Sequence, residues 1–189
     1  MRVKILSTNL NSQRLNNLLI TGPPRCGKTT VVKKIINDPQ ATQKLGGFYT
    51  EEFRKKGERV GFKIISLPNK KEGILARKGL SSLYRVGKYG VNLEDFEKIG
   101  CSAVKEALSA GKTIIIDEIG KMELYSDIFK DVLLHALDST NRVLATIMEK
   151  KNEFADEIKK RKDVKLISLD RTNFITIFME VKSWFEMFS

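Results

Sequence analysis

The sequence predicts a single α/β domain over residues 1–189, with a mainly parallel sheet flanked by helices and an inserted antiparallel meander. Strand-like runs alternate with stretches of helical periodicity, which is typical of parallel sheets with crossover helices. The run Thr113-Ile114-Ile115-Ile116 is β-branched throughout, as expected for a parallel strand covered on both faces. Three strand-like segments joined by short polar turns lie within residues 46–79 and predict the meander.

The first half of the chain contains four expected strands and two expected helices. One helix is expected to end before Asp38-Pro39, because proline cannot continue a helix. The other is expected from apolar residues at a spacing near 3.6 and ends at Gly111. The expected elements are strands at residues 16–21, 46–53, 59–67 and 72–77, and helices at residues 29–37 and 93–110.

The second half continues the alternation with three strands and three helices. Ser126 is placed to cap one helix, because a serine oxygen can accept the free N–H groups of a first turn. Residues 1–14 are harder to assign: Val3-Lys4-Ile5-Leu6 either adds an edge strand or belongs to a loose extension. The expected elements are strands at residues 113–116, 143–148 and 164–169, and helices at residues 127–137, 152–160 and 172–188.

Composition excludes several classes of protein. Of the 189 residues, 41% are apolar, which is enough for a core without disulfides or structural metal. The two cysteines form no CxxC pair, which argues against a secreted disulfide framework and a thiolate zinc site. The single histidine, His135, cannot build a metal site alone. No leader-like segment or membrane-length apolar run is present, so we expect a soluble cytoplasmic protein without a membrane partner.

The formal charge of +11 suggests an anionic partner such as a nucleotide, a nucleic acid or a membrane surface. Residues 53–90 contain eleven basic and two acidic residues, a net +9 that falls to +7 when the segment starts at residue 51. Four lysines of this segment lie on expected turns, where a solvated face is the ordinary role. These lysines are Lys55, Lys56, Lys70 and Lys71.

A phosphate-binding loop is predicted between the first strand and the first helix. Residues 22–29 match the Walker A pattern G-x-x-x-x-G-K-[ST]. Backbone N–H groups of such a loop surround the phosphates, while the lysine reaches the β- and γ-oxygens and the hydroxyl reaches Mg²⁺. The roles of Arg25 and Cys26 stay open. The predicted nucleotide-binding residues of this region are Gly22, Pro23, Pro24, Arg25, Cys26, Gly27, Lys28, Thr29 and Thr30.

Two carboxylates follow the buried strand at residues 113–116, as in a Walker B segment. Ligands of parallel sheets bind at the carboxyl ends of strands, which places Asp117 for Mg²⁺ together with Thr29. Glu118 is then placed to orient or deprotonate a water molecule. This second carboxylate favours hydrolysis, because a phosphotransferase must exclude water from its site. Glu123 is either a further polar contact or a surface residue.

These segments together resemble the thermophile-type nucleoside-triphosphatase family, which is related to the animal cancer-related nucleoside-triphosphatases. The resemblance covers residues 16–169 and includes GPPRCGKTT, GGFYTEE, GFKIISL, GILAR, RVGKYGVNL and IIIDEIGKMEL. It implies a RecA-like P-loop fold, Mg²⁺, and hydrolysis of ATP, GTP and other nucleoside triphosphates. It also implies a second nucleotide-lining segment consisting of Thr113, Ile114, Ile115, Ile116, Asp117, Glu118, Ile119 and Gly120.

The chain departs from the family pattern at three places. Residues 1–14 are extra, Arg25 stands where glycine is usual, and Arg171-Thr172-Asn173 replaces the usual order before the last helix. A contact from that last region to the base therefore stays open.

The basic segment supplies a candidate for neutralising charge in the transition state. Among its cations, Arg85 of the family-like RVGKYG segment is the one we expect to act on the γ-phosphate, as a third catalytic residue with Lys28 and Glu118. Two other functions stay open: a nucleotide or small-molecule kinase on the same fold, and a nucleic-acid-binding protein with a nucleotide switch. Base preference, oligomeric state and physiological partner are not determined by the sequence.

Overall fold

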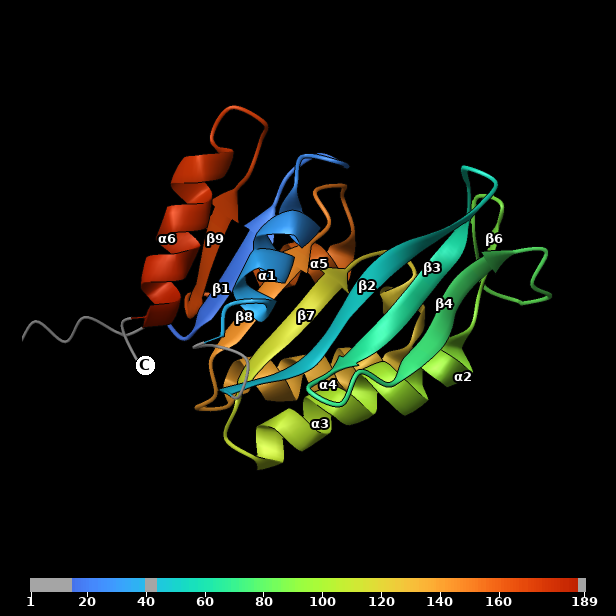
Figure 1. The fold of residues 1–189 in the computed structure, drawn as a ribbon. Coiled ribbons are helices and arrows are strands. Elements are labelled where there is room, and N and C mark those ends of the chain that lie inside the picture. Colours follow the sequence, from blue (N-terminus) through green and yellow to red (C-terminus); the bar gives the residue numbers. More distant parts are fainter. Residues whose placement is uncertain (1–14, 40–43, 187–189) are drawn as a thin grey trace, which may run out of the picture.

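A computed structural model describes residues 15–39 and 44–186 (Figure 1). Nine strands form one sheet in the order β5-β6-β4-β3-β2-β7-β8-β1-β9. β2, β7, β8, β1 and β9 are parallel neighbours, and antiparallel pairing begins where β2 meets β3. The mainly parallel α/β architecture predicted from the sequence is confirmed. The possible edge strand within residues 1–14 lies outside the described residues.

The strands and helices of the described chain follow the predicted alternation. The strands are β1 (Asn17–Thr21), β2 (Leu45–Lys55), β3 (Glu58–Leu67), β4 (Glu72–Lys78), β5 (Arg85–Val86), β6 (Tyr89–Val91), β7 (Thr113–Ile119), β8 (Val143–Ile147) and β9 (Val164–Ser168). The helices are α1 (Lys28–Ile36), α2 (Leu93–Asp95), η2 (Phe96–Cys101), α3 (Ser102–Ser109), η3 (Glu123–Tyr125), α4 (Asp127–Asp138), α5 (Glu153–Lys159) and α6 (Phe174–Glu186).

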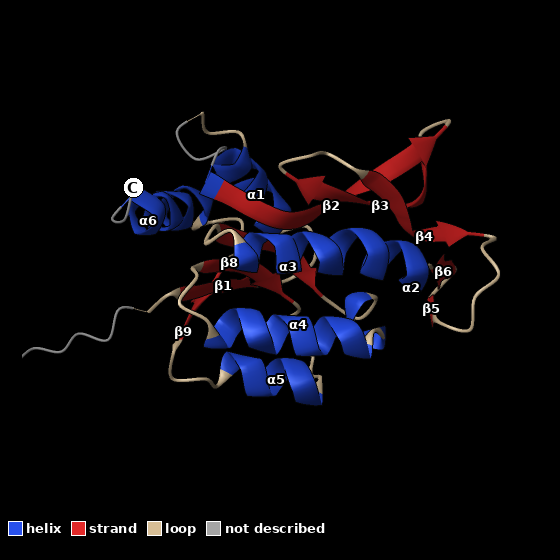
Figure 2. Ribbon diagram, turned by 90° about the horizontal axis from the view of Figure 1, so that it is seen from below, coloured by secondary structure: helices blue, strands red, loops and turns tan. Residues whose placement is uncertain are grey.

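The helices divide between the two faces of the sheet (Figures 1 and 2). On one face, α1 and α6 bury residues such as Val31 and Val181 against β1 and β9. On the other, η2, α3, α4 and α5 pack over the sheet, and the rings of Phe48, Phe96 and Phe129 meet in edge-to-face contacts at centroid distances of 5.1–6.0 Å. Covering both faces is what requires the continuous apolar runs of the parallel strands.

The structure adds three features that the sequence did not specify. β2 pairs with β7 as well as with β3, so the inserted meander is part of the main sheet. The helix expected over residues 93–110 is continuous but contains a π-helical stretch, η2. β5 and β6 were not expected, because strands of two and three residues are too short to show alternation.

None of the described helices combines the length and the apolar character needed to cross a lipid bilayer.

Candidate functional site

The predicted phosphate loop and the predicted acidic strand end lie at the same edge of the sheet. The loop joins the carboxyl end of β1 to α1, and the acidic pair lies at the carboxyl end of β7. β8 is hydrogen-bonded to both strands and separates them. Because the three strands are parallel, their carboxyl ends meet at one edge of the sheet, where ligands of such sheets bind.

Two glycines allow the loop to pass close to neighbouring elements. Gly22 has φ +146°, and a Cβ placed there would lie 2.1 Å from the carbonyl oxygen of Leu169. Gly27, the N-cap of α1, has φ +112°, and a Cβ there would lie 3.0 Å from the ring of Phe174. The end of β9 and the first residue of α6 therefore press against the loop, and any side chain at either glycine would force them apart.

Within the loop, Lys28 points back over the loop's own backbone. Its Nζ donates to the carbonyl oxygens of Gly22, at 2.8 Å, and Pro23, at 3.2 Å. Cys26 is buried, consistent with a small side chain that fits the loop. Arg25 is exposed and has φ +66°, a left-handed conformation that favours glycine at this position. The glycine usual in the resembling family is therefore explained by backbone geometry.

Asp117 connects the acidic strand end to the loop. Its side chain is fully buried, and its Oδ1 accepts hydrogen bonds from the hydroxyls of Thr29, at 3.2 Å, and Thr146, at 2.7 Å. Burial raises the pKa of Asp117, while the two hydroxyls and the nearby charge of Lys33 oppose that rise. Its Oδ2 is buried and has no hydrogen-bond partner among the described residues.

Thr146 is a site residue that sequence reasoning missed. It lies on β8, the strand between β1 and β7, and it is completely buried. The signal was present in the sequence: Thr146 is the only hydroxyl-bearing residue of a strand that is otherwise apolar and buried throughout. A polar side chain in such a strand needs a partner, and here the partner is Asp117.

The residues present fit a magnesium ion. A buried carboxylate oxygen without a partner lies on Asp117, beside a threonine hydroxyl of the phosphate loop. In the described part of the chain, no group of three His, Cys, Asp or Glu residues could hold a metal ion by itself. A site with so few protein ligands is typical of Mg²⁺, which usually keeps several waters and binds one or two carboxylates together with substrate phosphates.

Glu118 lies next to Asp117 and is half-buried. Burial raises the pKa of Glu118, the charge of Lys28 lowers it, and the carboxylate of Asp117 raises it. The role of Glu118 as the base stays a prediction.

Other residues of the predicted nucleotide-lining segment are not brought to this edge. Thr113 is at the amino end of β7, opposite the loop. Ile114 and Ile116 are buried in the core under α3 and α4, and Ile115 in the core under α1. Within this segment, the part at the carboxyl edge runs from Asp117 to Gly120.

Glu123 is buried, so the surface alternative is wrong. Only 5% of the residue is exposed, and its Oε2 accepts a hydrogen bond from the N–H of Gly120 at 3.2 Å. Burial, together with the negative charges of Glu118 and Asp117, raises the pKa of Glu123 to about 8.

Arg85 is exposed on the short edge strand β5, which β6, β4, β3 and β2 separate from β7. Its backbone carbonyl accepts a hydrogen bond from the hydroxyl of Tyr125 at 2.9 Å, which ties this edge to η3. The described structure records no contact between the Arg85 guanidinium and Lys28, Asp117 or Glu118.

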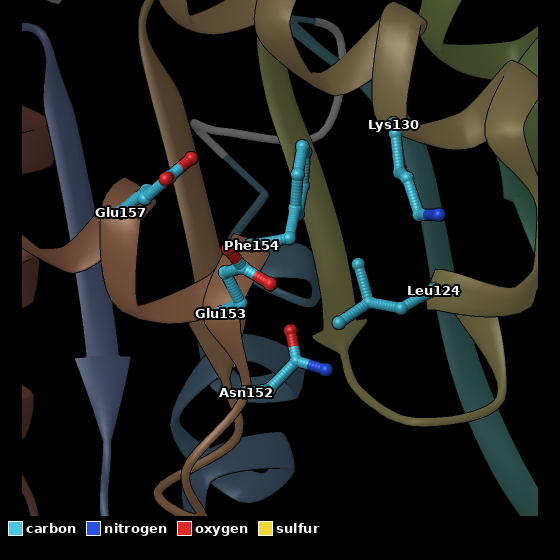
Figure 3. A pocket seen from close by; sticks show the side chains of 6 residues that line it. All are labelled: Leu124, Lys130, Asn152, Glu153, Phe154 and Glu157. Atoms are coloured by element: carbon cyan, nitrogen blue, oxygen red, sulfur yellow. The ribbon is translucent and has the colours of Figure 1, made fainter.

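A cavity of about 340 Å³ lies between η3, α4 and the start of α5 (Figure 3). None of the phosphate-loop residues lines it, so it is distinct from the site above. Its walls combine apolar, acidic and basic side chains. They are Leu124, Lys130, Asn152, Glu153, Phe154 and Glu157.

The chain is similar to known proteins over most of its length. The family model described as "NTPase" matches residues 17–182. "Nucleoside-triphosphatase THEP1" of Thermotoga sp. (strain RQ2) is 48% identical over 166 residues, which cover 88% of this chain and 93% of the relative.

Two solved structures share the fold. The crystal structure of THEP1 from the hyperthermophile Aquifex aeolicus is 37% identical, with a TM-score of 0.77, and the match covers 87% of this chain and 96% of that one. The solution structure of a human cancer-related nucleoside triphosphatase is 32% identical, with a TM-score of 0.75, and covers 88% and 95%.

Proposed function

Since the chain belongs to the NTPase family, whose model spans residues 17–182, we propose that it hydrolyses nucleoside triphosphates to nucleoside diphosphate and phosphate. The observation that carries the proposal is the hydrogen bond between Thr29 and Asp117. It joins the phosphate loop to the acidic strand end, the two parts that phosphoanhydride chemistry needs together. The names of the relatives favour a hydrolase over a kinase or a nucleic-acid-binding switch.

The phosphate loop binds the triphosphate. Its N–H groups and the N-terminus of α1 offer positive potential to the phosphate oxygens. Lys28 exchanges its hydrogen bonds to Gly22 and Pro23 for the β- and γ-oxygens, so the resting contacts hold the ammonium close to where it is needed. Every nucleoside triphosphate carries the same phosphates, which supports a broad range of substrates including ATP and GTP.

Thr29 and Asp117 are the residues that would hold Mg²⁺. The ion supplies neutralisation of the phosphate charges when bound. Thr146 keeps Asp117 oriented toward Thr29, because both hydroxyls donate to the same carboxylate oxygen.

Glu118 is the general base that orients and deprotonates the attacking water. Its burial favours the protonated form and so makes the carboxylate a stronger base than one in open solvent. Arg85 is the candidate for stabilising charge on the γ-phosphate. Because four strands separate β5 from β7, this role requires the β5 edge to come closer to the phosphate loop when a nucleotide binds. Two free, buried cysteines, Cys26 and Cys101, support a reducing, cytoplasmic location.

The proposal is tested by phosphate release from ATP, GTP, CTP and UTP, with Mg²⁺ and with EDTA. Glu118→Gln should keep nucleotide binding and slow turnover roughly 10²–10⁴-fold, the usual size of a base effect. Glu94→Gln makes the same change at an exposed position of α2 and should leave turnover unchanged. Unchanged turnover in Glu118→Gln would eliminate Glu118 as the base, and absence of phosphate release from the wild type would eliminate the function.

A further inference from the structure

We infer that Glu123 is a positioning residue, whose buried carboxyl group holds the turn after Glu118 and thereby fixes the Glu118 side chain for attack on the triphosphate. The inference rests on the proposed hydrolysis for its catalytic consequence. The hydrogen bond between Gly120 and Glu123, which fixes the turn, does not depend on the proposed hydrolysis.

Main-chain hydrogen bonds hold this turn on two sides. The N–H of Leu124 donates to the carbonyl of Gly120 at 3.0 Å, and the N–H of Met148, just after β8, donates to the carbonyl of Ile119 at 3.0 Å. These contacts satisfy acceptors but leave the Gly120 N–H, which points into the protein. Glu123 Oε2 accepts that N–H at 3.2 Å. A buried N–H without a partner is costly, so the carboxyl group stabilises this turn by accepting it.

The side chains of Glu118 and Glu123 both lie close to Gly120. A Cβ placed on Gly120 would lie 2.9 Å from Glu123 Oε2 and 3.4 Å from Glu118 Cδ. Both carboxyl groups therefore border the same small volume, and Gly120 is the residue whose lack of a side chain allows this. A change in the Gly120 turn must move the Glu118 carboxyl, because little free space separates them.

The charge state of Glu123 suits a hydrogen-bonding role. With a pKa of about 8, the group is mostly protonated at pH 7 and adds little negative charge beside Glu118 and Asp117, the charged groups that act on it. The three acids do not form a metal cage, since the described residues contain no group of three metal-binding side chains with suitable placement. Glu123 thus differs from Asp117 in function while sharing its burial.

Paired substitutions separate this role from simple packing. Glu123→Gln keeps an acceptor oxygen for the Gly120 N–H, whereas Glu123→Leu keeps similar volume and removes the acceptor. Steady-state phosphate release should show kcat about 10–100-fold lower in Glu123→Leu with KM changed less than about threefold, because a misplacement near 1 Å can cost 10²-fold in rate. Glu123→Gln should keep kcat within about threefold of the wild type.

A matched control accounts for lost stability. Ser126→Ala removes the cap of α4, where Ser126 Oγ accepts from Phe129 N at 3.0 Å, without touching Gly120. It should lower the melting temperature and leave kcat unchanged when assayed well below that temperature. An unchanged kcat in Glu123→Leu, or a loss in Ser126→Ala as large as that in Glu123→Leu, would overturn the inference.

Hydrogen–deuterium exchange tests the hydrogen bond independently of activity. Peptides covering residues 118–122 should exchange at least about tenfold faster in Glu123→Leu than in the wild type, and at the wild-type rate in Glu123→Gln. If the wild type released no phosphate, the proposed function would fail. If residues 118–122 of Glu123→Leu exchanged at the wild-type rate, Glu123 would not hold the turn, whatever the activity.

Discussion

Glu123 is a buried carboxyl group whose ionisation opposes folding. Its pKa rises from an ordinary 4.5 to about 8 in the folded chain, so the native state binds a proton that the unfolded state has released between these values. Binding of this proton adds to the free energy of unfolding. The contribution is fully present below pH 4.5 and is lost as the pH rises toward 8. The sign is opposite to that of an ion-paired carboxylate.

We therefore expect Glu123→Gln to flatten the dependence of stability on pH. Between pH 5.5 and 7.5 the free energy of unfolding of the wild type should fall relative to this variant, by at most about 1.4 kcal/mol per pH unit. Urea denaturation at three pH values measures the difference. Glu94→Gln, at an exposed site, should keep the wild-type slope. A parallel pair of curves for the wild type and Glu123→Gln would contradict the raised pKa.

At the scale of elements, α6 contacts the phosphate loop with its first residue and the residue before β8 with its last turn. Its first residue, Phe174, lies against Gly27. In its last turn, the carbonyls of Trp184 and Phe185 accept hydrogen bonds from the guanidinium of Arg142, whose Cζ lies 3.7 Å from the Trp184 ring centroid. Burial lowers the pKa of Arg142 to about 10, and the planar group satisfies carbonyls that the helix cannot.

Arg142→Ala should destabilise the protein by about 2–3 kcal/mol, because it removes both the hydrogen bonds to the helix end and the contact with Trp184. Arg142→Lys should recover less than half of this loss, since a single ammonium cannot reproduce the two-pronged geometry. Chemical denaturation, with Trp184 fluorescence as the probe, measures both variants. Full recovery by lysine would show that charge alone matters at this position.

At the scale of the whole molecule, the basic charge of residues 53–90 is divided. Lys55, the last residue of β2, and Lys56 lie at the β2–β3 turn. Lys70 and Lys71 lie near the β3–β4 turn, at the opposite end of the ten-residue β3 and about 30 Å away. All four are exposed, as the sequence predicts for a solvated face. Several neighbouring cations are paired, including Arg54 with Glu52 at 2.8 Å, Lys63 with Glu72 at 2.6 Å and Lys78 with Glu58 at 3.0 Å.

Because the turn lysines lie at the two ends of β3 and several neighbouring cations are paired with carboxylates, we expect a single-stranded RNA homopolymer to change the rate of phosphate release less than twofold at 150 mM salt. The measurement is the release assay with and without the polymer, accompanied by a salt titration of binding. Strong stimulation, with the logarithm of affinity falling steeply and linearly against the logarithm of salt, would restore the nucleic-acid alternative.

The parts of the fold that could be predicted from the sequence were those with a local cause. A β-branched run such as residues 113–116 and a glycine-rich turn ending in Lys28 and Thr29 report their structure directly. β5 and β6 are held by pairing with β4, which no local pattern records. The contact of Thr146 with Asp117 joins residues 29 positions apart and exists only because β8 lies beside β7.

The sequence by itself determined the α/β class, the phosphate loop, the acidic strand end and the family likeness, because each depends on residue types at fixed short spacings. Only the tertiary structure decided that the meander continues the main sheet, that Arg85 lies on a distant edge strand, and that Glu123 is buried beside Glu118. Burial and strand order arise from contacts between segments far apart in the chain. For the same reason, the pKa of Glu123, which depends on loss of water around it, could not be deduced from its neighbours in sequence.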